Sequence, residues 1–265
     1  MTSSLRLAIN GASGRMGREL LQQVRADRRF ELAHAAVTPG SEHDGVPLPG
    51  MSLRCTHDWQ AAPALDVVVD FSSPAGLGTA LAHCLSHRIA LVTGTTGLDA
   101  AQERRLAEAA QRIPLLRAAN FSLGVAVLTR LLRQAAAALR EWDLEIVEAH
   151  HGRKEDAPSG TALALGEAAA AARGVVLADA AVYARQGRPG PRRAGSIGFA
   201  VVRGGDVVGE HQALLLGKGE RVELGHRATD RSIFARGALE AAHWLAGRAP
   251  GAYDLDAMLA ERTGG

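Results

Sequence analysis

Residues Leu5–Gly17 read L-R-L-A-I-N-G-A-S-G-R-M-G, a short apolar strand that ends at Asn10 and runs into a glycine turn. A helical pattern follows the turn and continues to about Arg25. A strand, a glycine turn and a helix, in this order, open a dinucleotide-binding βαβ unit. Glycines let the backbone approach a pyrophosphate, and the helix N-terminus faces its charge. Because the spacing is G-x-x-G-x-x-G rather than G-x-G-x-x-G, a plain tight turn is the alternative. The predicted nucleotide-binding positions are Gly11, Ala12, Ser13, Gly14, Arg15 and Met16.

Strand and helix patterns alternate along the next hundred residues. Helices are predicted from Ser72-Ser73-Pro74 onward and over Ala100–Arg112, and the run Pro39–Gly50 is predicted to be a surface loop. This alternation predicts a doubly wound parallel sheet with right-handed crossovers. The predicted strands are Glu31–Val37, Asp66–Phe71, Ile89–Thr93 and Ile113–Leu116.

Two further loops follow strand ends in this pattern. Ligands of doubly wound sheets bind at the carboxyl ends of the strands, so both loops are candidates for the nucleotide site. Taken singly, Thr95 and Thr96 fit an ordinary turn and Asn120 fits a helix cap. The candidate positions are Gly94, Thr95, Thr96, Ala118, Ala119, Asn120 and Phe121.

The rhythm changes after Phe121, where a long helix over Leu123–Leu139 precedes an alternating strand at Trp142–Ala149. Residues Ser196–Ala228 show three strands with short turns, which predicts a β-meander in a separate antiparallel or mixed sheet. The amphipathic helix Arg231–Ala246 is assigned to the first domain. We therefore predict an α/β chain with two domains. A Rossmann-like, doubly wound dinucleotide-binding domain spans 1–122 and 231–265, and an α+β domain with a mixed sheet spans 123–230.

Residues Glu148–Thr161 read E-A-H-H-G-R-K-E-D-A-P-S-G-T and are predicted to form a loop between a strand end and a helix N-terminus. This arrangement suits a small dianion. Backbone N–H groups of Ser159–Thr161 can hold one carboxylate, while His151 and Lys154 supply further donors. His150 titrates near neutral pH and can pass a proton. The alternative is a solvated polar loop that caps a helix.

Lysine is rare in this chain, which draws attention to Lys154. Of the 30 Lys+Arg residues only Lys154 and Lys218 are lysines. A guanidinium keeps its proton in a protein, whereas an ammonium can give its proton up.

The histidines at 211, 226 and 243 stand singly and are predicted to be structural or exposed. No pair of them has metal-ligand spacing, so no metal is predicted.

Composition narrows the classes of function. A net charge of +2 gives no argument for nucleic acid or membrane partners, and no apolar run approaches the roughly 20 residues that span a bilayer. The start M-T-S-S-L-R lacks the apolar stretch of a signal peptide. Cys55 and Cys84 have no zinc or redox spacing. We expect a soluble cytoplasmic protein.

Four motifs together resemble one family, 4-hydroxy-tetrahydrodipicolinate reductase (dihydrodipicolinate reductase), from Leu5 to about Leu259. The stretch H-H-x-x-K-x-D-A-P-S-G-T is highly specific for it, and the glycine turn is not. Later segments, such as S-I-G-F-A-V-V-R-G-G-D-V-V-G-E-H, also look like this family. The motifs are G-A-S-G-R-M-G, G-T-T-G, A-A-N-F-S-L-G-V and E-A-H-H-G-R-K-E-D-A-P-S-G-T-A.

The resemblance implies an enzyme that reduces a cyclic unsaturated imine dicarboxylate in lysine and diaminopimelate synthesis, with hydride from NADH or NADPH. It implies that His150 and Lys154 are the acid/base and proton donor, and that the three candidate loops form the dinucleotide site. It also implies a homotetramer formed through the sheet of the second domain. The substrate-binding residues that it implies are His151, Ser159, Gly160 and Thr161.

The chain departs from the family at the end of the second strand, where Thr38-Pro39 replaces an acidic residue that often binds the adenosine ribose. The preference between NADH and NADPH therefore stays open. Two other functions also stay open. An aldehyde dehydrogenase of the aspartate-semialdehyde type would need a cysteine nucleophile. A dinucleotide-sensing regulator would have no need of His150 together with Lys154.

Overall fold

The computed structural model describes residues 4–262, which form two compact units. One unit comprises residues 4–123 and 232–262, and the other comprises residues 124–231. No helix among the residues that the structure describes is long and apolar enough to cross a membrane.

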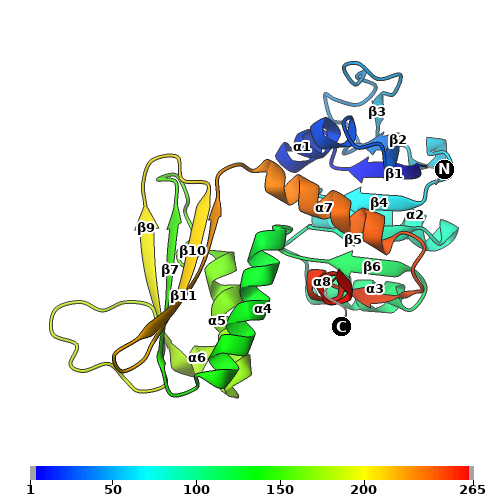
Figure 1. Ribbon diagram of the computed structural model, residues 1–265. Coiled ribbons are helices and arrows are strands. Elements are labelled where there is room, and N and C mark those ends of the chain that lie inside the picture. The colour runs from blue at the N-terminus through cyan, green and yellow to red at the C-terminus, as the bar shows by residue number, and fades with distance from the viewer. Residues whose placement is uncertain (1–3, 263–265) are drawn as a thin grey trace. The chain divides into compact units, whose positions relative to one another are not determined.

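The discontinuous unit contains a parallel sheet of seven strands in the order β12-β6-β5-β4-β1-β2-β3 (Figure 1). The predicted doubly wound parallel sheet is therefore confirmed. Two short strands were not predicted, because β3 and β12 have two and three residues and show no periodicity. The strands are β1 (Leu5–Asn10), β2 (Phe30–Ala36), β3 (Cys55–Thr56), β4 (Val67–Asp70), β5 (Ala90–Thr93), β6 (Pro114–Arg117) and β12 (Gly251–Tyr253).

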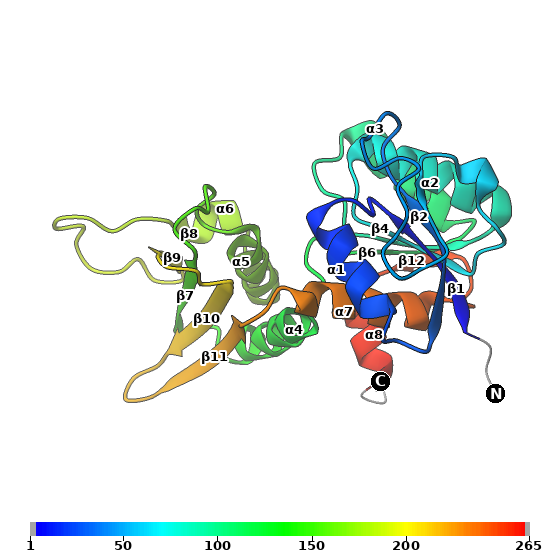
Figure 2. The same ribbon diagram turned by 90° about the horizontal axis from the view of Figure 1, so that it is seen from above.

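Helices cover both faces of this sheet. Helices α1 (Arg15–Val24), α7 (Ser232–Leu245) and α8 (Leu255–Arg262) lie on one face, and α2 (Pro74–His87) and α3 (Ala100–Ala110) lie on the other (Figure 2). A short 3₁₀ helix, η1, spans Trp59–Ala61. Helix α7 packs so closely on the end of the loop after β6 that a Cβ on Gly237 would lie 1.8 Å from the carbonyl oxygen of Phe121.

Local sequence signals explain where α2 and α3 begin. The Ser73 hydroxyl accepts a hydrogen bond from the N–H of Gly76, and Pro74 occupies the first turn of α2, where its missing N–H costs nothing. Helix α3 begins with a capping box, in which Asp99 and Gln102 bind each other's backbone N–H groups. These caps place both helices directly after strand ends, as the alternation predicts.

The second unit contains a mixed sheet of five strands in the order β11-β10-β7-β9-β8. The predicted meander is wrong in one respect, because β7 lies between β9 and β10 instead of beside the group. It pairs parallel with β9 and antiparallel with β10. The strands are β7 (Asp143–His150), β8 (Ala181–Val182), β9 (Ile197–Arg203), β10 (Gly209–Leu216) and β11 (Arg221–Ala228).

The connection between β9 and β10 crosses the carboxyl end of β7. The N–H of His151 donates to the carbonyl of Val207, and the N–H of Gly204 donates to the carbonyl of His150. This crossing brings the end of β9 and the start of β10 to opposite sides of His150.

Helices cover one face of the mixed sheet (Figure 1). They are α4 (Leu123–Ala138) and α5 (Gly160–Arg173), and the short α6 (Leu177–Ala180) follows α5. Within residues 124–231 no helix covers the opposite face, where Val202 is 53% exposed. The core between helices and sheet includes Leu128, Leu132, Leu144, Ile146, Leu165, Ile197, Phe199 and Leu215.

Candidate active site

The alternation of β7 directs Leu144, Ile146, Glu148 and His150 to the helical face of the sheet. The first two pack in the core, and the last two are also buried, with Glu148 1% and His150 9% exposed. His150 is the last residue of β7. The prediction that both histidines lie on a loop is therefore wrong for His150, which the strand holds rigidly at the edge of the core.

The carboxylate of Glu148 accepts hydrogen bonds on both oxygens. Oε2 accepts from His150 Nδ1 and, at 3.0 Å, from Arg203 Nη1. Oε1 accepts from Arg203 Nη2 at 2.8 Å and from the N–H of Ser159 at 3.1 Å. Burial raises the pKa of Glu148, but the bonds from Arg203, His150 and Ser159 outweigh burial and bring this pKa below its ordinary value. Glu148 is therefore ionised at neutral pH.

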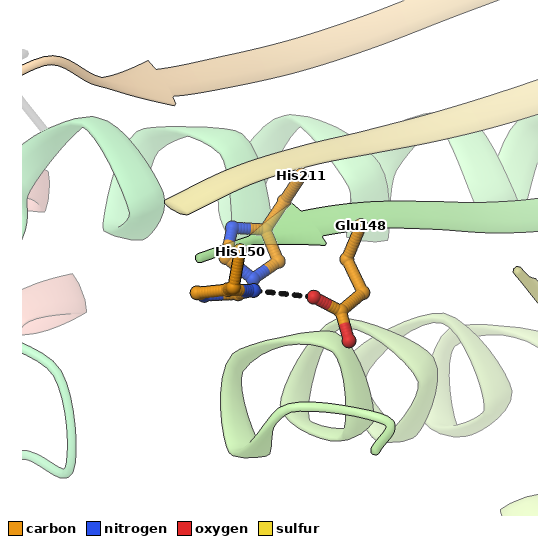
Figure 3. A group of neighbouring side chains, drawn as sticks. All are labelled: Glu148, His150 and His211. Carbon is orange, nitrogen blue, oxygen red and sulfur yellow. Dashed lines mark hydrogen bonds and ion pairs between the residues drawn. The ribbon is translucent and has the colours of Figure 1, made fainter. Parts of the chain in front are cut away.

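His211, at the start of β10, lies against His150 with ring centroids 5.2 Å apart (Figure 3). Its Nε2 lies 3.1 Å from the hydroxyl oxygen of Ser159. Burial, together with the neighbouring His150, lowers the pKa of His211 to about 4. His211 was predicted to be a structural or exposed residue, because no local pattern links it to His150.

Glu148, His150 and His211 offer three ligand atoms within 4.8 Å of one another. Such a set of nitrogen and oxygen donors can bind zinc. However, both oxygens of Glu148 already pair with Arg203. A divalent cation would have to displace this guanidinium, so these contacts do not favour metal binding.

The loop after β7 carries the other predicted polar residues. Lys154 is partly buried, and its ammonium donates to Asp156 Oδ1 at 2.7 Å. His151 Nε2 lies 3.3 Å from Arg231 Nη2. Desolvation lowers the pKa of His151, and the neighbouring Arg231 and Arg153 lower it further. The sequence alone did not point to Asp156 or Arg231. Asp156 is defined by its contact with nearby Lys154, and Arg231 by its contact with His151, which is distant in sequence.

Ser159 caps helix α5, and its hydroxyl accepts from the N–H of Ala162 at 3.2 Å. Ser159 is buried, and its own N–H already donates to Glu148. Gly160 is exposed and Thr161 is half-buried. The backbone N–H of Ser159, one of the three predicted anion donors, is thus engaged inside the protein.

Two positions of the glycine turn in the first unit, Gly11 and Gly17, require glycine because of backbone conformation or close packing. Gly11 has φ +83°, a conformation that glycine adopts at low cost, and a Cβ on Gly17 would lie 2.1 Å from the carbonyl oxygen of Gly11. Gly14 precedes α1 and provides no side-chain cap. Of the other predicted positions, Ala12 is buried, Arg15 is exposed, and Ser13 and Met16 are half-buried.

Behind the second predicted nucleotide loop lies a fully buried carboxylate, that of Asp70. It accepts hydrogen bonds from Asn10 Nδ2 at 2.7 Å, Ser72 Oγ at 2.5 Å, Thr93 Oγ1 at 2.7 Å and Thr95 Oγ1 at 2.6 Å. Thr95 therefore points inward. The sequence predicts Asp70 only as part of a continuous apolar strand. It gives no sign that this carboxylate binds the side chains that position the loops.

The remaining nucleotide-loop positions are placed by contacts at the same edge. Thr96 is exposed, and a Cβ on Gly94 would lie 2.2 Å from the ring of Phe71. The ring of Phe121 is buried against Phe71, with centroids 5.2 Å apart. Asn120 Oδ1 accepts from the N–H of Ser122 at 2.8 Å. Ala118 is half-buried and Ala119 is exposed.

The two cysteines do not suit nucleophilic catalysis. Cys55 and Cys84 are both buried, and burial raises the pKa of each thiol. A nucleophilic thiol needs a lowered pKa and access to its substrate. This excludes the aldehyde dehydrogenase alternative.

Comparison with protein families assigns both parts of the chain. The family model described as "Dihydrodipicolinate reductase, N-terminus" matches residues 5–121, and "Dihydrodipicolinate reductase, C-terminus" matches residues 124–259. The chain belongs to the dihydrodipicolinate reductase family. Members of this family are oxidoreductases that use a nicotinamide cofactor, and this chain is therefore an enzyme of that class.

Curated relatives and a solved structure agree with this family. The 4-hydroxy-tetrahydrodipicolinate reductase of Cereibacter sphaeroides strain KD131 is 49% identical over 94% of this chain and 96% of the relative. That of Thiobacillus denitrificans is 48% identical over 97% of this chain and 98% of the relative. A dipicolinate-bound dihydrodipicolinate reductase from Paenisporosarcina sp. TG-14 has the same fold, with a TM-score of 0.79 and 23% identity over 95% of this chain and 97% of that one.

Proposed function

We propose that His150 and Lys154 supply the protons for a reductive step in which the nicotinamide cofactor supplies the hydride. The reaction is that of the family: the chain reduces 4-hydroxy-tetrahydrodipicolinate, by way of dihydrodipicolinate, to tetrahydrodipicolinate in the diaminopimelate and lysine pathway. The proposal places this step in the cytoplasm. One observation carries the residue roles, namely that hydrogen bonds to side-chain and backbone atoms of Glu148, Arg203 and Asp156 connect His150, Lys154 and Ser159 in one network.

The substrate is a small dianion, and the loop offers the groups that such a dianion requires. Lys154 and His151 lie on the same loop, and the start of α5 follows with Gly160 and Thr161. We assign one carboxylate of the substrate to the α5 N-terminus, where N–H groups and the helix dipole favour an anion. We assign the other carboxylate to His151 and Lys154, and we place Ser159 at the base of the same binding site. The solved relative from Paenisporosarcina sp. TG-14 is described as binding dipicolinate, which is also a dicarboxylate.

The unit of residues 4–123 and 232–262 is assigned to the cofactor. The backbone of the glycine turn and the uncapped start of α1 fit a pyrophosphate, because N–H groups at a helix start bind anions. The loops at Gly94–Thr96 and Ala118–Phe121 follow β5 and β6 at the same edge of the sheet. In this assignment the cofactor supplies the hydride, and the chain's residues orient it.

A coupled assay tests the function. The product of dihydrodipicolinate synthase is added to the protein with NADPH, and nicotinamide oxidation is followed by its absorbance. We expect saturable oxidation that dipicolinate inhibits competitively. Binding of NADPH without turnover would instead support the dinucleotide-sensing regulator.

The cofactor preference provides a second test. Thr38, exposed after β2, replaces the carboxylate that would repel a 2′-phosphate, and Arg15, exposed in the first turn of α1, is a cation near the predicted phosphate loop. We expect both cofactors to be used, with NADPH equal or better by about 1–2 kcal/mol, which is roughly 5–30-fold in kcat/KM. The Arg15→Ala variant should lose this preference for NADPH in kcat/KM. An equivalent change at exposed Arg28 is the matched control. A wild type that prefers NADH, or an unchanged ratio in Arg15→Ala, contradicts the assignment.

The oligomeric state provides a third test. The sheet face opposite α4 and α5 carries apolar side chains, including Val147, Val202, Leu214 and Leu216. Burial of such a face between copies is favourable, and we propose a homotetramer assembled through it. Light scattering should report about 110 kDa, four times 27.7 kDa. Leu214→Glu should dissociate the assembly, whereas Val176→Glu, exposed away from this face, should not. A monomeric wild type would refute the proposal.

A further inference from the structure

The hydrogen bonds of Glu148 determine which nitrogen of His150 carries a proton. An ionised carboxylate can only accept hydrogen bonds. Glu148 is ionised, and its Oε2 pairs with His150 Nδ1. In neutral His150 the proton must therefore lie on Nδ1, which leaves Nε2 with its lone pair. Nε2 makes no hydrogen bond within residues 4–262, and the His150 side chain is 11% exposed to solvent.

We propose that Glu148 is a positioning residue, which locks His150 in the Nδ1–H tautomer so that only Nε2 exchanges a proton with the substrate, and that Arg203 holds Glu148 for this task. The inference rests on the proposed role of His150. It adds two residues, Glu148 on β7 before the loop and Arg203 on β9, to those of the His-His-x-x-Lys motif. Neither of the two touches the substrate in this proposal.

The same carboxylate also ties the His150 ring to the start of α5. Glu148 accepts the N–H of Ser159, the cap of the helix to which one substrate carboxylate is assigned. Ring and helix start are thus fixed relative to each other through one side chain. Gly209, opposite the ring, preserves the space at Nε2, because a Cβ there would lie 3.0 Å from that atom.

Arg203 balances the charge of Glu148. It donates through both terminal nitrogens to the carboxylate and through Nη2 to the carbonyl of Asp156, at 2.8 Å. A buried carboxylate without this cation would bind the proton of the imidazolium more tightly. Arg203 thus keeps His150 able to release its proton, and it anchors the loop that carries Lys154.

Several titratable or charged groups surround His150 besides Glu148. His211 faces its ring from β10, and Arg203 reaches the shared carboxylate from β9. His151 and Lys154 belong to the following loop. Among residues 4–262, Glu148 is the one acidic residue that pairs with the ring, so the effect of this carboxylate can be isolated.

The Glu148→Gln variant tests the tautomer directly. Arg203 Nη2 and the N–H of Ser159 hold the amide oxygen at the Oε1 position. The amide NH₂ then takes the Oε2 position, where it displaces Arg203 Nη1 and donates to His150 Nδ1, which must accept. The proton of neutral His150 moves to Nε2. We expect kcat to fall by about 10²-fold, the pH profile of kcat to move to lower pH, and the Kd of NADPH to stay unchanged.

Glu145→Gln is the matched control. Glu145 lies on the same strand and also pairs with two arginines, Arg185 and Arg192, but not with His150. It should keep the wild-type kcat and pH profile. If Glu145→Gln and Glu148→Gln lower kcat and Tm alike, without a change in the pH profile, then Glu148 is only structural and the inference fails.

Long-range ¹H–¹⁵N spectra of ¹⁵N-histidine-labelled protein read the tautomer without substrate or turnover. His150 is assigned by its loss in a His150→Gln sample. We expect Nδ1–H in wild type and Nε2–H in Glu148→Gln. An Nε2–H tautomer in wild type overturns the inference even in a fully active enzyme, whereas an inactive wild type with Nδ1–H would overturn only the proposed function.

Arg203→Gln supplies an independent test if Glu148→Gln does not fold. Removal of the cation leaves Glu148 to stabilise the imidazolium alone, so the pH profile of kcat should move to higher pH, opposite to Glu148→Gln. Arg203→Lys keeps the charge and should restore the position of the profile in part. A displacement in the same direction for Glu148→Gln and Arg203→Gln would contradict the proposal.

Discussion

His150→Gln is expected to lower kcat by about 10²–10⁴-fold, the range that a general acid or base contributes. The glutamine amide can still donate to Glu148, so the buried carboxylate keeps a partner in place of Nδ1. What the variant loses is the imidazole, the group that can accept and donate a proton. The Kd of NADPH should not change, because the predicted nucleotide loops lie on residues 4–123 and His150 lies on the other unit.

The measurements are kcat from the coupled assay, Kd from fluorescence titration, and Tm as a check of folding. His87→Gln, an exposed histidine at the end of α2, is the control and should behave as wild type. A variant at position 150 that keeps its kcat and loses only NADPH affinity would show that the proton-transfer role is wrongly assigned.

Lys154→Arg is expected to lose about as much kcat as Lys154→Ala, roughly 10²-fold, although it keeps the positive charge. The arginine can still pair with Asp156, which now binds the ammonium at 2.7 Å. It cannot hand a proton to the substrate, because a guanidinium stays protonated in proteins. The prediction thus separates proton donation from electrostatic attraction at one position.

Lys218→Arg provides the matched control, since Lys218 is the other lysine of the chain and is exposed between β10 and β11. Its kcat and KM should equal those of wild type. Full activity of Lys154→Arg would mean that Lys154 acts only as an anchor for a substrate carboxylate. A raised KM with an unchanged kcat would lead to the same conclusion.

The local sequence pattern was sufficient to predict most of the helices and strands. The strand before Asn10, the capped helices α2 and α3 and the alternating β7 were predicted within a few residues of their observed bounds. Their signals come from neighbours in sequence, namely apolar period, caps and turn residues. Strands β3, β8 and β12 have two or three residues each and owe their conformation to pairing with a neighbouring strand, so no local signal marks them.

The sequence by itself determined the family, the parallel sheet and the residues of the His-His-x-x-Lys motif, because each of these is written in contiguous residues. Only the tertiary structure decided that β7 lies between β9 and β10. That strand order brings Arg203 and His211 to Glu148 and His150. Strand order depends on which long-range pairing buries the most apolar surface and satisfies the most backbone hydrogen bonds, and residues fifty or sixty positions apart carry no mutual signal in a single sequence. The partners of His150 were therefore visible only in the folded chain.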